Sequence, residues 1–330
     1  MTLVLDQLKM HANCDAIAMC SDGKRFLLGT YELHEGIEQL RHGSISLFTS
    51  NGDKFELMTT CEAPAGVLDI KFRKAPTVTR DDSSEVFAVA LADGTVRVGQ
   101  VSPDDQVKVE EGCKLSSPSS STNTIALSVS WMPADTDRPR VAATFNTGVV
   151  REYQLTNNAS SFVVLREYSV STLEVWAVLH RGPLIYTGGD DSKLWRTATA
   201  DGSSRVIRRF SSGVTAIEAD PLYEENLLVG TYEDRLYQFD LRMMRDPLQE
   251  VDIGGGVWRI KDHPARTGLL AVAGMYAGAF IVDCCLETWA IKQRYTGHES
   301  MCYGIEWWDE KTLLSCSFYD RQLTMWRLLD

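Results

Sequence analysis

The chain has little positive charge and no segment that could cross a membrane. Its 33 lysines and arginines are outnumbered by 45 aspartates and glutamates, and the formal net charge is −12. That balance argues against a protein that binds nucleic-acid phosphates. The apolar segment 269–282 is too short for a transmembrane helix, and the N-terminus has no basic region followed by a long apolar stretch. We therefore expect no signal peptide, no membrane contact and a cytoplasmic location.

Metal-ligand spacing is also missing. The 8 cysteines are scattered along the chain, no two of them form a CxxC pair, and no cysteine–histidine spacing suits zinc. We expect reduced thiols of the kind found in cytosolic proteins, and neither a metal nor a cofactor. No segment of useful length has the hydrophobic period of a helix, so the pattern favours an all-β fold.

The sequence does contain a repeat. Four C-terminal segments share a short apolar opening, an apolar strand that ends in small residues, a tight turn and a second alternating strand. The last strands of this pattern end at Thr197, Phe239, Val282 and Trp326, which gives spacings of 42, 43 and 44 residues. A period near 43 with short strands is typical of the blades of a WD-type β-propeller.

The N-terminal half fits three more blades, around segments 26–48, 67–98 and 129–153. We predict a seven-bladed WD-repeat propeller that forms one domain over residues 1–330, with a flexible Ser-rich loop near 113–124. The last blade lacks a fourth strand, and the alternating segment 3–8 can supply it. Such pairing of the two termini closes the ring and removes an open sheet edge. We expect a monomer.

In a propeller of this kind, the first strand of each blade lines the central channel. Alignment of the seven openings places one residue per blade near the channel mouth: Asp15, Leu68, Leu127, Trp176, Thr215, Trp258 and Tyr303. The three aromatic residues, with Glu174 close by, suit a quaternary ammonium group through cation–π attraction. The alternative is that these side chains only fill the channel as apolar packing.

Polar residues near the same face are candidates for catalysis. His298 could act as a general base for Ser300 or for water. The alternative is a structural imidazole that hydrogen-bonds Asp320 in the adjacent turn. Asp190 and Asp191 form a paired carboxylate in which one pKa could be raised, although aspartates commonly cap such turns.

Arg259 follows directly after Trp258 in the sequence. Its guanidinium could bind a carboxylate or stabilise an oxyanion.

Residues 254–264, Gly-Gly-Gly-Val-Trp-Arg-Ile-Lys-Asp-His-Pro, resemble the Gly-Gly-Val-Trp-Arg-Ile/Leu-Lys-Trp-His-Pro segment of the diphthine methyl ester hydrolase (diphthine methylesterase) family. These are WD-repeat proteins of diphthamide biosynthesis. Segments 186–191, 298–304 and 316–320 are similar to further family segments in the same order. The resemblance extends over residues 174–327, whereas the first half resembles the family only as propeller blades. Asp262 stands where the family has tryptophan.

The resemblance implies hydrolysis of the methyl ester of diphthine methyl ester on elongation factor two, which releases methanol. The substrate group carries a trimethylammonium, which fits the aromatic mouth. We assign Trp176, Trp258 and Tyr303, helped by Glu174, to cation binding, and His298, Ser300, Arg259, Asp190 and Asp191 to catalysis. The rival interpretation is a non-catalytic WD-repeat scaffold that mediates protein–protein interactions. A reader of methylated lysines is a weaker third possibility.

Overall fold

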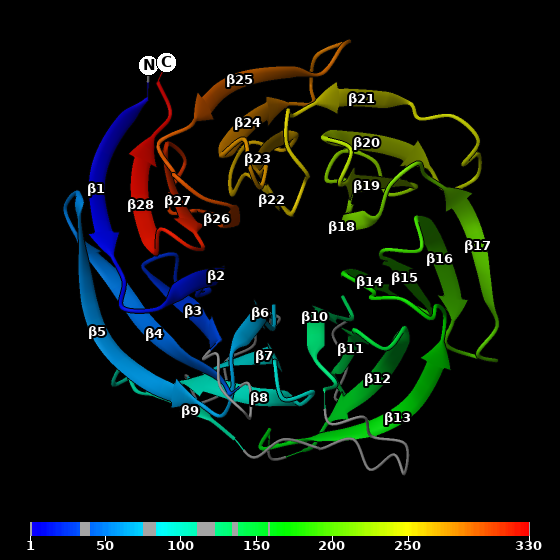
Figure 1. Ribbon diagram of the computed structural model, residues 1–330, viewed down its shortest axis with the longest axis horizontal. Coiled ribbons are helices and arrows are strands. Elements are labelled where there is room, and N and C mark those ends of the chain that lie inside the picture. Colours follow the sequence, from blue (N-terminus) through cyan, green and yellow to red (C-terminus); the bar gives the residue numbers. More distant parts are fainter. Residues whose placement is uncertain are drawn as a thin grey trace.

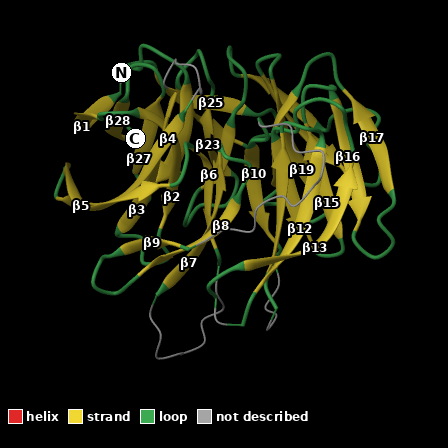
Figure 2. Cartoon of the chain, turned by 60° about the horizontal axis from the view of Figure 1, so that its bottom comes forward, coloured by secondary structure: helices red, strands yellow, loops and turns green. Residues whose placement is uncertain are grey.

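The computed structural model describes residues 2–33, 40–74, 84–110, 123–133, 138–157 and 159–329. These residues form seven four-stranded antiparallel sheets, arranged as blades around a central axis (Figure 1). In each blade the first strand lies nearest the axis and the fourth lies farthest from it. Figure 2 shows the blades from another side, with strands and loops but no helix among the described residues. The predicted all-β, seven-bladed propeller is confirmed.

The first four blades follow one another along the chain. Blade 1 contains β2 (Asn13–Met19), β3 (Arg25–Leu33), β4 (Arg41–Asn51) and β5 (Lys54–Ala63). Blade 2 contains β6 (Val67–Phe72), β7 (Glu85–Leu91), β8 (Val96–Val101) and β9 (Val107–Val109). Blade 3 contains β10 (Ala126–Trp131), β11 (Arg140–Phe145), β12 (Val149–Leu155) and β13 (Phe162–Ser169). Blade 4 contains β14 (Ala177–Arg181), β15 (Leu184–Gly188), β16 (Lys193–Ala198) and β17 (Ser204–Arg209).

The last three blades complete the ring. Blade 5 contains β18 (Val214–Ala219), β19 (Asn226–Thr231), β20 (Arg235–Asp240) and β21 (Gln249–Asp252). Blade 6 contains β22 (Arg259–Asp262), β23 (Leu269–Ala273), β24 (Ala279–Asp283) and β25 (Ala290–Tyr295). Blade 7 contains β26 (Cys302–Trp307), β27 (Thr312–Ser317) and β28 (Gln322–Arg327), and its fourth strand is β1 (Leu3–Lys9).

The ring closes through the two ends of the chain. Strand β1 pairs antiparallel with β28, with Leu3 opposite Arg327 and Lys9 opposite Gln322. The N and C labels accordingly lie side by side in Figure 1. This is the closure that the alternating segment 3–8 predicts. The loop predicted near 113–124 falls largely outside the described residues.

Small residues in the second strands let neighbouring blades approach closely. A Cβ atom added to Gly188 or Gly230 would lie 2.4 Å from Cγ1 of Val214 or Val257 on the next blade. That distance is far below an ordinary carbon–carbon contact, so a larger residue would push the blades apart. The repeated small residues that reveal the blades in the sequence are therefore places where one blade packs into the next.

A β-bulge recurs at the start of the first strand and orients the side chains near the axis. The register shifts at Asp15, Leu68, Leu127, Thr215 and Tyr303 in blades 1, 2, 3, 5 and 7. A bulged residue is left out of the ladder, and its side chain is turned away from the sheet. In blades 4 and 6 the equivalent residues, Trp176 and Trp258, lie just before the first strand.

Candidate functional site

An aromatic cluster lies at the axis, on the face formed by the loops that precede the first strands. The centroid of the Trp258 ring lies 4.8 Å from that of Tyr303, 5.5 Å from that of Trp176 and 6.4 Å from that of Tyr232. Blades 4, 5, 6 and 7 each contribute one ring. The three aromatic residues expected to meet at the mouth do meet, and Tyr232 from the turn between β19 and β20 joins them.

The two tryptophans of this cluster have different polar surroundings. Trp176 Nε1 donates a hydrogen bond of 2.6 Å to the carboxylate of Asp190, which holds the partly exposed indole in place. Trp258 is 9% exposed, and its Nε1 is buried with no hydrogen-bond partner among the described residues. A buried donor without a partner is costly, so a ligand or water that accepts from Trp258 would be favoured there.

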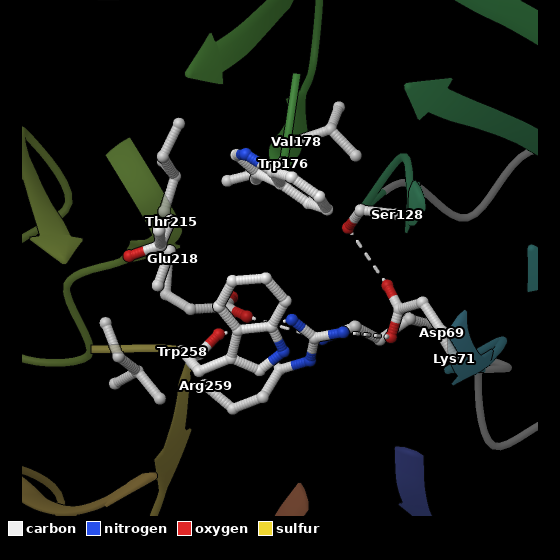
Figure 3. A pocket seen from close by; sticks show the side chains of 13 residues that line it. Asp69, Lys71, Ser128, Trp176, Val178, Thr215, Glu218, Trp258 and Arg259 are labelled. Atoms are coloured by element: carbon white, nitrogen blue, oxygen red, sulfur yellow. Dashed lines mark hydrogen bonds and ion pairs between the residues drawn. The ribbon is translucent and has the colours of Figure 1, made fainter. Parts of the chain in front are cut away.

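Below the aromatic rings lies a small charged cavity of about 20 Å³, close to the volume that one water molecule needs (Figure 3). Arg259 reaches across the axis from blade 6, and its guanidinium lies 3.6 Å from the Asp69 carboxylate of blade 2. Asp69 also accepts hydrogen bonds of 3.0 Å from the Ser128 hydroxyl and from the Val129 amide. Burial opposes ionisation of Asp69, but the positive charges of Arg259 and Lys71 and the two hydrogen bonds outweigh it, so the pKa of Asp69 is lowered.

A second carboxyl group near the axis behaves in the opposite way. Asp15 is 5% exposed, and burial raises its pKa to about 7, because the attraction of Arg259 offsets that effect only in part and Asp69 adds repulsion. The two aspartates thus differ in their environments: Asp69 stays ionised, while Asp15 gains and loses its proton near neutral pH. Pairs of carboxyl groups with separated pKa values are typical of acid–base sites.

The structure does not bring His298 and Ser300 together. His298 Nε2 lies 2.8 Å from the Ser315 hydroxyl, which also accepts a 3.1 Å hydrogen bond from Trp326 Nε1. Ser300 Oγ instead accepts a hydrogen bond from the backbone amide of Tyr319. The expected base–nucleophile pair is therefore wrong as a contact. The imidazole is held inside blade 7, and its partner is Ser315 rather than the expected Asp320.

Burial lowers the pKa of His298 to about 4, so its imidazole is neutral at physiological pH. A neutral imidazole that is enclosed between strands fits the structural alternative better than the catalytic one.

The paired carboxylates of blade 4 are divided between two tasks. Asp191 accepts hydrogen bonds from the Lys193 amide and the Trp195 indole of its own blade, so it caps the turn. Asp190 accepts from Trp176, as described above, and burial raises its pKa, with Glu174 and Asp191 adding repulsion. Glu174 is partly buried beside this turn, and its backbone carbonyl accepts from the Asp190 amide. Of these acids, Asp190 has the direct contact with the aromatic cluster.

Within the described ranges, no group of three or more histidine, cysteine, aspartate or glutamate side chains is arranged to hold a metal ion. Over the same residues, no helix has the length and apolar character needed to span a bilayer.

Comparison with known proteins gives a consistent result along most of the chain. No protein-family model matches it. A diphthine methyltransferase homolog of Dictyostelium discoideum is 26% identical over 91% of this chain and 92% of its own length. The diphthine methyltransferases of Homo sapiens and Schizosaccharomyces pombe are 26% and 28% identical, over 92% and 91% of this chain and 74% and 90% of their own lengths. Over about nine-tenths of its length, the chain is therefore similar to several diphthine methyltransferases.

The similarity to these relatives extends further along the chain than the motifs alone indicate. The motif resemblance covers residues 174–327, whereas the alignments with family members include the N-terminal blades as well. A chain in the crystal structure of the mitotic checkpoint complex aligns with all of this chain and 93% of its own, with a TM-score of 0.74 at 12% identity. That likeness concerns the propeller fold alone.

Two features of the site do not follow from the sequence pattern. That pattern placed Asp15 at the mouth but gave it no chemical role, because its burial depends on neighbouring blades that are distant in sequence. It also missed Tyr232, although an aromatic residue in a turn between second and third strands lies on the same face as the mouth. The position of Tyr232 in such a turn was the sequence signal that could have placed it in the cluster.

Proposed function

We propose that this chain hydrolyses the methyl ester of diphthine methyl ester on elongation factor two, as a step of diphthamide biosynthesis. The relatives are named for diphthine, which supports the substrate class. The observation that carries the proposal is the aromatic cluster of Trp176, Trp258 and Tyr303 directly above two carboxyl groups and an arginine. The substrate combines a trimethylammonium group with an ester. The aromatic cluster suits the trimethylammonium group, and the carboxyl groups and the arginine suit the ester.

The trimethylammonium group would bind on the partly exposed sides of the rings. Because neighbouring ring centroids are 4.8 and 5.5 Å apart, no such group fits between them. A cation within about 6 Å of a ring centroid gains roughly 0.5–2 kcal/mol from each suitable face. Asp190, bonded to Trp176, adds a negative charge beside this surface.

Asp15 and Arg259 would carry out the ester chemistry. The ionised Asp15 carboxylate accepts a proton from water as the water oxygen attacks the ester carbonyl carbon, and Arg259 stabilises the resulting oxyanion. Collapse of the tetrahedral intermediate breaks the bond to the methoxy oxygen. That oxygen takes the proton back from Asp15 and leaves as methanol. This scheme uses Arg259 as the sequence predicts and replaces His298 and Ser300 with Asp15.

The deciding experiment incubates the purified chain with elongation factor two that carries diphthine methyl ester, without any methyl donor. Loss of the mass of one CH₂ group, with release of methanol, is the expected result. A gain of methyl groups that requires an added donor would contradict hydrolysis and favour methyl transfer. Binding without a mass change would favour the non-catalytic scaffold.

Single substitutions, compared with a control variant, test which residues bind the substrate and which carry out the reaction. Trp258→Ala should weaken substrate binding, and Asp15→Asn should lower kcat. Trp308→Ala changes a partly buried tryptophan that packs on another cluster, at the far end of β26, and serves as the control. Full activity of both Trp258→Ala and Asp15→Asn would refute these assignments. Loss of activity in His298→Ala with unchanged stability would restore the histidine mechanism.

A further inference from the structure

Two strongly exposed tyrosines stand beside the aromatic cluster. Tyr276 lies in the turn between β23 and β24 and is 77% exposed, and Tyr319 lies in the turn between β27 and β28 and is 67% exposed. We call these two residues the tyrosine rim. Tyrosine is enriched among residues that contribute strongly to protein–protein binding, since it buries a large area at low entropic cost.

Hydrogen bonds hold the backbone of both turns that carry the rim residues. The Tyr319 amide donates to the Ser300 hydroxyl at 3.2 Å, and the Met275 carbonyl next to Tyr276 accepts from the Cys302 amide at 2.9 Å. The second contact ties blade 6 to blade 7. The turns are therefore ordered before a partner arrives, while the rings remain in solvent, and preorganisation of this kind favours binding.

The rim lies close to the cation-binding cluster. Tyr319 packs edge-to-face on Phe318 at 4.9 Å, and Phe318 packs on Tyr303 at 5.5 Å. Burial raises the pKa of Tyr303, and the nearby Asp15 and tyrosine hydroxyls, including those of Tyr276 and Tyr319, raise it further. A protein that presents a side chain to the cluster would thus contact the rim as well.

The face around the rim is acidic. Exposed carboxylates in the turns and loops of the same face include Asp190, Glu233 and Glu299. Several basic side chains of that face already pair with acids, as in Lys193 with Asp191, Arg235 with Glu250 and Arg321 with Glu32. No basic side chain pairs with Asp190, Glu233 or Glu299 among the described residues, so these carboxylates suit a partner with lysines and arginines.

We propose that the tyrosine rim and the carboxylates beside it dock a basic loop of the protein that carries the modified side chain. This inference rests on the proposed function and extends it. The enzyme would recognise its substrate in two parts, the cation on the aromatic cluster and the surrounding protein surface on the rim. The ester would consequently be cleaved faster on its protein than on a small molecule.

The test compares two substrates, elongation factor two that carries diphthine methyl ester and the methyl ester of glycine betaine, which has the same charged group but no protein. In the variant Tyr276→Ala/Tyr319→Ala, the ratio of kcat/KM for the protein to that for the small ester should fall about 10- to 100-fold. Raising the salt concentration from about 0.1 M to about 1 M should lower the same ratio for the unchanged enzyme, because exposed charges are then screened. Tyr223→Ala removes a tyrosine that is 58% exposed, between β18 and β19 at the opposite end of blade 5, and should leave the ratio unchanged.

The outcomes separate this inference from the proposed function. An equal fall for both substrates, or no fall for either, would overturn the docking role. If the unchanged enzyme cleaves neither ester, the proposed function fails, and direct binding of elongation factor two then tests the rim: loss of binding in the double variant supports docking and unchanged binding refutes it. A dimer that the double variant abolishes would assign the rim to a second copy of this chain and overturn the inference.

Discussion

Replacement of Asp15 by asparagine should change how stability depends on pH. The pKa of Asp15 rises from its ordinary 3.8 to about 7 in the folded protein, mainly because it is buried. Folding therefore favours the protonated carboxyl, and the folded state is penalised wherever the unfolded chain would ionise. For an acid with a raised pKa, stability is greatest at low pH and is lost as the pH rises from about 4 through about 7.

The size of the effect follows from the two pKa values. A shift of about three units corresponds to about 4 kcal/mol of unfolding free energy once both states are ionised. At pH 5 the unfolded carboxyl is largely ionised and the folded one is not, so the penalty is about 1.5 kcal/mol. Near pH 8 it approaches the full value. Asp15→Asn removes this term, so its advantage over the unchanged protein should grow by about 2.5 kcal/mol between pH 5 and pH 8.

Urea unfolding at several pH values measures this difference. Asp69→Asn is the matched comparison, because the lowered pKa of Asp69 has the opposite sign: its contribution is present above the unfolded pKa and lost in acid. That variant should be less stable than the unchanged protein at neutral pH, since Arg259 loses its buried partner. Parallel pH dependences for Asp15→Asn and the unchanged protein would refute the burial argument.

Three further outcomes are expected. Ser315→Ala leaves His298 and Trp326 without their shared hydrogen-bond partner and should lower the unfolding free energy by about 2–3 kcal/mol, measured by chemical denaturation, without loss of ester cleavage per folded molecule. Trp176→Phe removes the hydrogen bond to Asp190 and should raise KM for a cationic ester about 3- to 10-fold with little change in kcat, while an uncharged ester is unaffected. Deletion of strand β1 should expose the edge of β28 and cause aggregation, seen by light scattering, and a synthetic β1 peptide should reduce it.

Much of the fold could be predicted because the repeat reflects packing. Glycines such as Gly188 and Gly230 recur where the next blade inserts a valine, and this recurrence is visible along the chain. The closing strand was also predictable, since the last blade ends one strand short and residues 3–8 alternate. The start of β14 was less predictable. The blade opening expected at residues 174–178 includes three residues that precede the strand.

The site could be predicted only in part. One position per blade faces the axis, so the meeting of Trp176, Trp258 and Tyr303 followed from the alignment of the openings. The partner of His298 did not follow, because Ser315 and Asp320 are both close in sequence and only the packing of β27 against β28 selects between them. Contacts across the ring, such as that between Arg259 and Asp69, join blades 6 and 2 and leave no local pattern.

The recurring bulge explains how such a site can arise on this fold. At the entrance of blades 1, 2, 3, 5 and 7 one residue is released from the ladder, so its side chain is not required to pack within its own sheet. Such positions tolerate residues as different as Asp15, Thr215 and Tyr303 without altering the blade. Asp15 and Thr215 of this set are buried, and Tyr303 packs on Trp258, which precedes the first strand of blade 6. A carboxyl at such a position, as at Asp15, is buried by its neighbours and acquires a raised pKa, and an aromatic ring, as at Tyr303, packs on the rings of other blades. The chemistry of the mouth is therefore set by a few side chains that the fold leaves free, while the blades keep them in position.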